Sequence, residues 1–194
     1  MLPFSNFGVV PKPVETMFAF RTYNYSSSHY LDSDLVELPY KGGEFSMVVI
    51  LPRRRNGIHK LLARLYGSVL ERALDDLSEA QVNLRMPKFE IDSLYSLVRS
   101  LQDLGARSIF TRDADLSGVS SSSGLFVSDV VHKAVLEVDE DGSGAAAQSS
   151  LDAEEIPSVK SGRPVLFHVN HPFLFCVRNV RSNLILLLST VHAL

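Results

Sequence analysis

Residues 139–164 contain almost no large apolar side chain, although apolar stretches precede and follow them. The segment consists mainly of Gly, Ala, Ser, Asp, Glu and Pro. A loop of this length is uncommon inside a compact domain and usually serves a function. The sequence therefore favours a fold in which two strands hold the ends of a long exposed loop.

The composition of the chain limits what this fold can be. The chain has 194 residues, a formal net charge of −3 and 45% hydrophobic residues. Such a chain can bury the core of one domain or two, and overall disorder is excluded. The charge argues against a nucleic-acid partner. Cys176 is the only cysteine, so a disulfide framework is excluded.

The sequence gives no indication of a metal site, a cofactor or a membrane-spanning segment. No set of cysteines and histidines has the spacing of a zinc site, and we expect neither a metal nor a cofactor. No apolar run is long enough to span a bilayer, so we expect no membrane partner. Residues 1–5 lack the positive start and apolar run of a signal peptide.

Hydrophobic periodicity predicts a mixed α and β structure. Residues 1–30 read as irregular, Tyr40 to Glu44 as a turn, and Gly57 to Leu77 as a helix split at Gly67-Ser68. A second helix is expected at 93–104, ended by Gly105. The expected strands are 35–38, 45–51, 82–86, 126–138, 173–179 and 184–190. The first two and the last two should form a small buried sheet core, and 126–138 should belong to a second, larger sheet.

The long segment itself alternates in a way that strands do. Its alternate residues are small or apolar: Ser143, Ala145, Ala147, Ser149, Leu151 and Ala153. That is the period of a strand with one buried face, yet Ala, Gly and Ser are poor strand formers. One interpretation is a loop that is exposed in one state and a strand in another, with Gly142 as the hinge. The alternative is a disordered linker.

The residues before and within this segment resemble a known signature. Val131 to Ala147 is similar to the hinge of the serpins, in which a strand containing His-Lys-Ala leads to an acidic pair, a Gly, a Ser or Thr and an alanine run. The resemblance extends from about Val14 to the C-terminus. Further serpin-like runs follow in the family's order: Leu35–Gly42, Ser46–Pro52, Met86–Phe89, Leu104–Ala106, Ala114–Val119, Val127–Val130 and His171–Phe175.

The resemblance implies a mixed α+β serpin fold in which residues 1–194 are an N-terminally truncated serpin domain with a mobile reactive loop at about 140–164. It implies no enzyme but a suicide inhibitor of serine proteases: the protease attacks the loop, which then inserts as a strand of the main sheet. It also implies an extracellular location. The implied hinge residues are Glu140, Asp141, Gly142, Ser143, Gly144, Ala145, Ala146 and Ala147.

The scissile bond implied by the resemblance has two candidates. Counting forward from Glu140 by the family's loop length reaches Ile156, and counting back from Phe167 reaches Ser161. Ile156-Pro157 is a poor bond for most serine proteases because proline follows it. Lys160-Ser161 lacks this defect, so we favour Lys160 and a trypsin-like target.

The chain has roughly half the length of a full serpin, and the absent half is N-terminal. In the family that half supplies the strand beside which the loop inserts and the hydrogen-bond partners of a buried histidine, which corresponds to His132. Three interpretations stay open: a fragment of an inhibitory serpin, a short non-inhibitory binding or decoy protein, and an unrelated enzyme. The enzyme is disfavoured because no Gly-x-Ser-x-Gly elbow is present.

Three lesser features complete the sequence predictions. Asn24-Tyr25-Ser26 is a glycosylation sequon, although such triplets are common by chance. Arg53-Arg54-Arg55 either binds a sulfated polysaccharide or forms a solvated turn. Cys176 lies in an apolar strand and is expected to be a buried core thiol.

Overall fold

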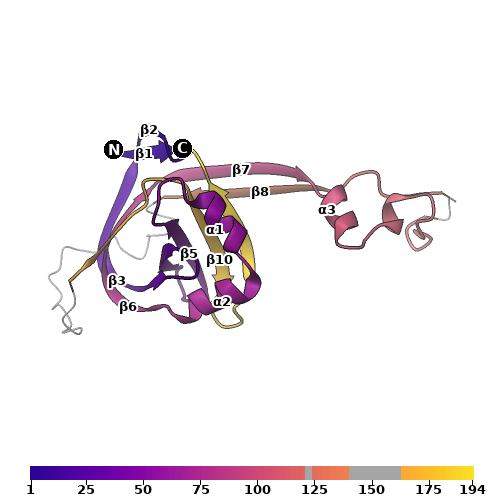
Figure 1. Ribbon diagram of the computed structural model, residues 1–194. Helices are drawn as coiled ribbons and strands as arrows, with labels where there is room; N and C mark the ends of the chain where they lie inside the picture. The colour runs from indigo at the N-terminus through magenta and orange to yellow at the C-terminus, as the bar shows by residue number, and fades with distance from the viewer. Residues whose placement is uncertain (121–123, 140–162) are drawn as a thin grey trace. The chain divides into compact units, whose positions relative to one another are not determined.

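The computed structural model describes residues 1–120, 124–139 and 163–194 (Figure 1). The chain forms two compact units. The first contains Met1–Phe89 and Val138–Leu194, and the second contains Glu90–Glu137. The expected hinge at 140–147 and both scissile-bond candidates lie outside the described residues.

The first unit is built on a seven-stranded sheet with the order β11-β10-β5-β4-β3-β6-β9. All neighbouring strands are antiparallel except β6 and β9, which are parallel. The strands are β3 (Thr16–Ser28), β4 (Ser33–Pro39), β5 (Phe45–Pro52), β6 (Ser78–Pro87), β9 (Val165–His168), β10 (Phe173–Asn179) and β11 (Ile185–Val191).

Strand β5 lies near the middle of this sheet and is buried on both faces. Val49 and Ile50 point to opposite faces, and each is 0% exposed. The continuous apolar run of β5 predicted this burial, which is confirmed. The turn before it is also confirmed, because Gly42 and Gly43 both have positive φ angles, at 93° and 70°.

Two short helices, α1 (Ile58–Arg64) and α2 (Gly67–Asp75), cover one face of the sheet (Figure 1). Leu65 and Tyr66 separate the two helices, close to the predicted break at Gly67-Ser68. Their apolar side chains pack with Leu31 and with sheet residues of β4, β5 and β10 in one buried cluster. The members of this cluster are Leu31, Leu35, Val48, Ile50, Ile58, Leu61, Leu70, Ala73, Leu74, Leu174 and Cys176.

Aromatic rings fill the opposite face of β10. Phe173 lies edge-on to Phe4 and Phe89, with ring centroids 6.3 and 5.6 Å apart. Phe175 lies 5.6 Å from Phe89, and both Phe173 and Phe175 are fully buried. Edge-to-face contacts of this kind suit the charge distribution of aromatic rings. The sheet is thus buried on both faces along β10.

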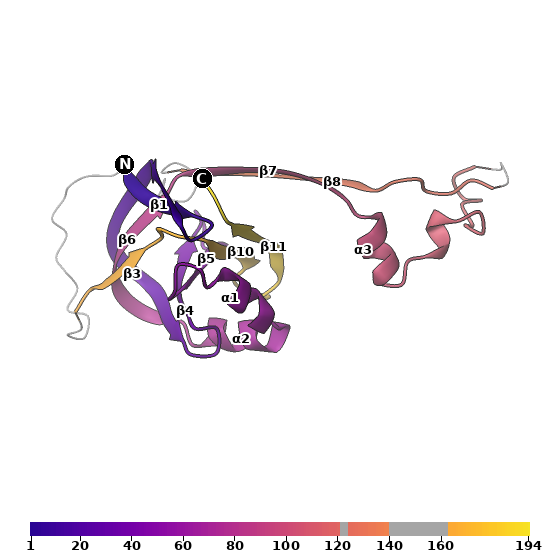
Figure 2. The ribbon, with the colours of Figure 1, turned by 45° about the horizontal axis from the view of Figure 1, so that its top comes forward.

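The expectation that residues 1–30 are irregular is wrong. They form β1 (Leu2–Asn6), β2 (Val10–Val14) and the long β3. Pairing supplies the reason, because β3 bonds to β6 along ten register positions from Thr16↔Pro87 to Tyr25↔Ser78. The two ends of the chain lie side by side (Figure 2), since the Phe7 amide donates to the His192 carbonyl at 2.7 Å.

The second unit contains a two-stranded sheet of β7 (Phe89–Ser96) and β8 (Val131–Val138), except for Phe89 and Val138, which belong to the first unit. Two predictions fail here. The expected helix at 93–104 begins only at Val98 as α3 (Val98–Asp103), because residues 93–96 pair as β7. The sheet of β8 has only two strands among the described residues, and the four expected core strands belong to the larger, seven-stranded sheet. Gly105 does end the helix, with φ at 102°.

Large apolar side chains stand exposed on both units. On β11 and before it, Leu184, Leu186 and Leu188 are 60%, 55% and 47% exposed. Helix α3 has no buried residue. Such surfaces favour contact with other apolar surfaces. Among the described residues, the helices are too short or too polar to cross a membrane.

Candidate functional site

The strands that flank residues 140–162 belong to different sheets. Strand β8 runs to Val138, which is 2% exposed, and Asp139 is the last described residue before the loop. The chain is described again from Arg163, and β9 then pairs in parallel with β6 through Val82↔Val165 and Leu84↔Phe167. Phe167 is 2% exposed and anchors β9 to the core. The strand predicted before this segment is thus present, although it begins at Val131, whereas β9 after the segment was not among the predicted strands.

His132 does not occupy the buried position that the family resemblance implied. It lies in β8 and is exposed. The second sheet has only two strands among the described residues, so nothing in that sheet covers its histidine. The energetic cost of an unpaired buried histidine therefore does not arise in this chain.

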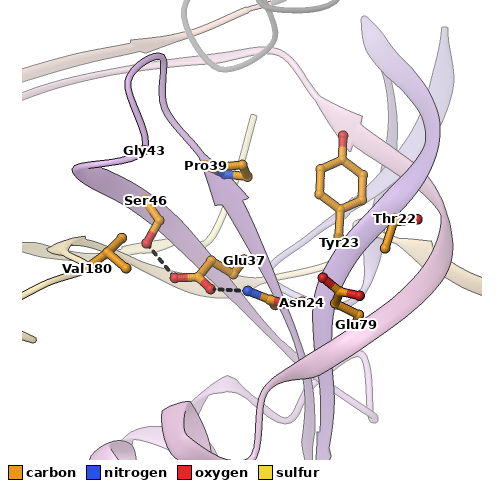
Figure 3. Close-up of a pocket in the computed structure, with 9 residues that line it drawn as sticks. All are labelled: Thr22, Tyr23, Asn24, Glu37, Pro39, Gly43, Ser46, Glu79 and Val180. Carbon is orange, nitrogen blue, oxygen red and sulfur yellow. Dashed lines mark hydrogen bonds between the residues drawn. The ribbon is translucent and has the colours of Figure 1, made fainter.

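A polar pocket of about 270 Å³ opens beside β3, β4 and β5 (Figure 3). Glu37 lines the pocket and is 5% exposed. Ser46 donates to Glu37 Oε1 at 2.6 Å, and Asn24 Nδ2 donates to Oε2 at 2.9 Å. Thr22, Tyr23 and Glu79 complete its polar wall.

Arg178 completes the hydrogen-bond network around Glu37. It lies in β10, which is separated from β4 by β5. Its Nε and Nη2 atoms both donate to Glu37 Oε1, at 3.0 and 2.6 Å. Its Nη1 donates to Asn183 Oδ1 at 2.9 Å. Arg178 is itself 7% exposed. A buried carboxylate is thus paired with a buried guanidinium, and all three guanidinium nitrogens donate a hydrogen bond.

The charge of Glu37 follows from these contacts. Burial by itself raises the pKa of its carboxyl group, but the hydrogen bonds from Ser46, Asn24 and Arg178 and the charge of Arg178 outweigh it. The pKa of Glu37 is therefore below its ordinary value, and the group is ionised at neutral pH. A carboxylate that already accepts four hydrogen bonds serves to join β3, β4, β5 and β10.

Sequence reasoning did not single out this network, although a signal was present. Glu37 interrupts the apolar β4, and Arg178 interrupts the apolar β10. A charged side chain in a buried strand needs a partner, and two such side chains of opposite charge can pair with each other. The predicted sequon residue Asn24 belongs to the same network. Its Nδ2 atom, which would carry a glycan, donates to Glu37.

The arginine run after β5 is partly engaged within the chain. Arg53 lies 3.8 Å from Asp32 and 3.7 Å from Asp34, and its Nη2 donates to Ser27 at 2.8 Å. These contacts tie the run to the start of β4 and balance part of its charge. They favour the solvated-turn interpretation over a polysaccharide site.

Cys176 is the core thiol that the sequence predicted. It is 0% exposed among the apolar residues of the cluster below α1 and α2. Burial raises the pKa of its thiol to about 11. The thiolate needed for nucleophilic chemistry is therefore not formed at neutral pH.

His171 joins the segment after β9 to the end of β5. Its Nε2 donates to the Pro52 carbonyl at 2.7 Å, and its Nδ1 lies 2.7 Å from Asn170 Oδ1. The residue is 6% exposed. Burial lowers the pKa of His171, and the charge of Arg55 lowers it further against the opposing effect of the Pro52 bond.

This burial predicts a pH-dependent stability. The unfolded chain protonates His171 near its ordinary pKa of 6.5, whereas the folded chain holds the ring neutral to lower pH. The free energy of unfolding should therefore fall by up to about 1.4 kcal/mol per pH unit for this residue between about pH 6.5 and the lower pKa of the folded state. Urea denaturation at a series of pH values measures this slope.

His171→Gln should flatten that slope, whereas His29→Gln should leave it unchanged because His29 is exposed. An equal slope in the wild type and in His171→Gln would contradict the assignment. The slope is the readout, so a lower overall stability of the variant does not affect the conclusion.

The described elements define a class: a mixed α and β protein in which residues 140–162 link β8, a strand of a two-stranded sheet, to β9, the parallel edge strand of the seven-stranded sheet. A family model described as Serpin (serine protease inhibitor) matches residues 3–193. The chain therefore belongs to the serpin family, and its fold is a partial serpin fold.

Individual relatives support the assignment to this family. The chain is 41% identical to Iripin-8 from Ixodes ricinus, over 98% of this chain and 48% of the relative. It is 36% identical to Serpin B3 from Homo sapiens, over 90% of this chain and 45% of the relative. The chain thus spans about half the length of the curated relatives it matches.

Solved structures give the same result. Uncleaved ovalbumin superposes with a TM-score of 0.83 at 25% identity, covering 100% of this chain and 48% of that one. Maspin superposes with a TM-score of 0.83 at 26% identity, covering 99% and 51%. The described fold is therefore that of the matched half of a serpin.

Proposed function

We propose that this chain is the C-terminal half of an inhibitory serpin of the suicide-substrate type, and that residues 140–164 are its reactive loop. Family membership supports the proposal, together with the hinge signature from Glu140 to Ala147 that follows β8. The two strands that flank the loop are a further support, because a bait must be held at both ends.

The mechanism requires the loop to change from bait to strand. After a protease forms its acyl-enzyme on the loop, the cleaved loop inserts into a sheet and carries the protease with it. Small side chains at Ser143, Ala145 and Ala147 would let the inward face enter without overpacking. Gly142 would supply the backbone freedom at the hinge. The driving force is the relaxation of a metastable fold, so inhibition is a kinetic outcome.

The proposed bait residue is Lys160, with Lys160-Ser161 as the scissile bond. A basic residue at this place selects a trypsin-like serine protease, whose pocket carries an acidic group. Ile156-Pro157 is the second candidate, and proline after the bond weakens it. The target would meet the protein outside the cell. Any sulfated polysaccharide partner would have to compete with the contacts of Arg53 to Asp32 and Asp34.

A second function, as a non-inhibitory binding or decoy protein, is favoured by one observation. Among the described residues, β8 pairs only with β7. The family inserts its loop between two strands of a larger sheet, and this chain spans about half of its relatives. The 194-residue chain alone therefore has a bait without an evident place to insert it.

Trypsin digestion tests the proposal. We expect the purified 194-residue chain to be cut after Lys160 and to form no complex that survives a denaturing gel. Lys160→Ala should abolish this cut, and Lys41→Ala, in the exposed β4–β5 turn, should leave it unchanged. Mass spectrometry of the fragments identifies the bond.

Two other outcomes would change the conclusion. A stable band at the summed mass of chain and protease would show that this half inhibits, and the argument from β8 would be wrong. Resistance of the whole 140–164 segment to trypsin would contradict its role as bait for a trypsin-like protease.

A further inference from the structure

One face of the sheet formed by β3, β6 and β9 carries two rows of side chains that point away from the core. In the first row, Phe18, Arg85 and His168 are register partners. In the second row, Phe20, Asn83 and Leu166 are register partners. We call these six residues the β3-β6-β9 face. All of them belong to the first unit.

The apolar members of this face are unusually exposed. Phe18 and Phe20 are each 62% exposed, and Leu166 is 58% exposed. The opposite face of the same strands already supplies the core, with Val82 and Met86 at 0%. The two phenylalanines and the leucine therefore do not serve the packing of the unit, and their exposure to water is unfavourable.

Arg85 adds an unsatisfied polar group at the centre of the face. Its Nε is buried and has no hydrogen-bond partner among the described residues. A buried donor without a partner costs about 1–3 kcal/mol. The planar fork of an arginine suits a carboxylate, which can accept from Nε and a terminal nitrogen together. The neighbouring side chains would have to turn aside for such a ligand to reach Nε.

The face carries a single full positive charge at neutral pH. Burial lowers the pKa of His168, and the charge of Arg85 lowers it further. The imidazole is therefore neutral at pH 7, and it contributes no second charge beside Arg85. A sulfated polysaccharide or an anionic membrane surface is held by clusters of cations. One cation flanked by apolar side chains matches a different ligand.

We propose that the β3-β6-β9 face binds a segment of a partner protein that presents one carboxylate next to an apolar side chain. The carboxylate accepts hydrogen bonds from Arg85, and the apolar side chain packs on Phe18 and Phe20. Aromatic and arginine residues are the types that contribute most at protein interfaces. The proposal does not depend on the bait role of the long loop.

A pair of peptides tests this binding on the full 194-residue chain. The first is acetyl-Ala-Phe-Glu-Leu-Ala-amide, and the second replaces its Glu by Gln. We expect the first to shift the Arg85 Nε–Hε signal in a ¹⁵N-¹H spectrum and to saturate. The Gln peptide should bind at least about fivefold more weakly, because a charge-assisted bond is lost.

Variants of the chain locate the site. Arg85→Gln and Phe18→Ser should each weaken the Glu peptide at least about fivefold. Arg64→Gln removes a charge from an exposed position of α1 and should leave the affinity unchanged. Thermal unfolding of each variant shows whether it is folded before it is compared.

Several results would overturn the proposal. These are no saturable shift at Arg85, equal binding of the Glu and Gln peptides, an equal shift produced by inorganic sulfate, or binding that survives both Arg85→Gln and Phe18→Ser. Dimers in sedimentation that Phe18→Ser disrupts would instead assign the face to a second copy of the chain. Trypsin digestion of the same variants reports separately on the long loop, so failure of this proposal is distinguishable from failure of the bait.

Discussion

Glu37→Ala is expected to lower the free energy of unfolding by about 3–5 kcal/mol, because it leaves a buried guanidinium without its carboxylate. Arg178 is 7% exposed and directs two donors at Glu37 Oε1. The substitution also removes the acceptor of Ser46 and of Asn24. Ser46 and Arg178 are themselves buried, so water has little access to the groups that would lose their acceptor.

Urea denaturation measures the loss, with Glu44→Ala as the matched control in the exposed turn before β5. The control should change the free energy of unfolding by less than about 0.5 kcal/mol. The double variant Glu37→Leu with Arg178→Met removes both charges, so it should lose less than Glu37→Ala alone. Equal losses in the double variant and in Glu37→Ala would show that packing, rather than the charge pair, governs the site.

Phe173→Ala is expected to lower the free energy of unfolding by about 3–5 kcal/mol through the cavity it leaves. Its ring is 0% exposed and lies within 6.3 Å of Phe4 and 5.6 Å of Phe89, measured between ring centroids. The substitution therefore removes contacts that join β1, β7 and β10. Edge-to-face geometry with these rings adds to the loss.

The control for this prediction is Leu186→Ala on the adjacent β11, where the leucine is 55% exposed. Denaturation of both variants should show a change of less than about 1 kcal/mol for the control. If Phe173→Ala does not fold, Phe173→Leu, which leaves a smaller cavity, allows the same comparison. A control loss as large as that of Phe173→Ala would mean that exposed β11 contributes to the core.

The pattern of apolar residues determined the centre of the fold, and it also predicted a long loop, which lies outside the described residues. The apolar run of β5, the paired glycines before it and the split helix after it all have local causes, and the structure contains each of them. The loop was marked by its lack of large apolar side chains. The hinge signature indicated the family from the sequence alone, because its residues are contiguous in the chain.

Features that depend on distant partners were decided only by the tertiary structure. Residues 16–28 lack a strong strand pattern, yet β3 is held by ten register positions with β6. Residues 93–96 fit a helical period, but pairing with β8 places them in a strand. His132 is exposed for the same reason, since its burial requires a neighbour that the described sheet does not contain.

The polar pocket shows this division within a single site. The sequence places a charge in each of two apolar strands, Glu37 in β4 and Arg178 in β10. Only the sheet order β10-β5-β4-β3 brings them together with Ser46 and Asn24. Local sequence determines which residues can form a strand, whereas the register between strands far apart in the chain determines which side chains meet.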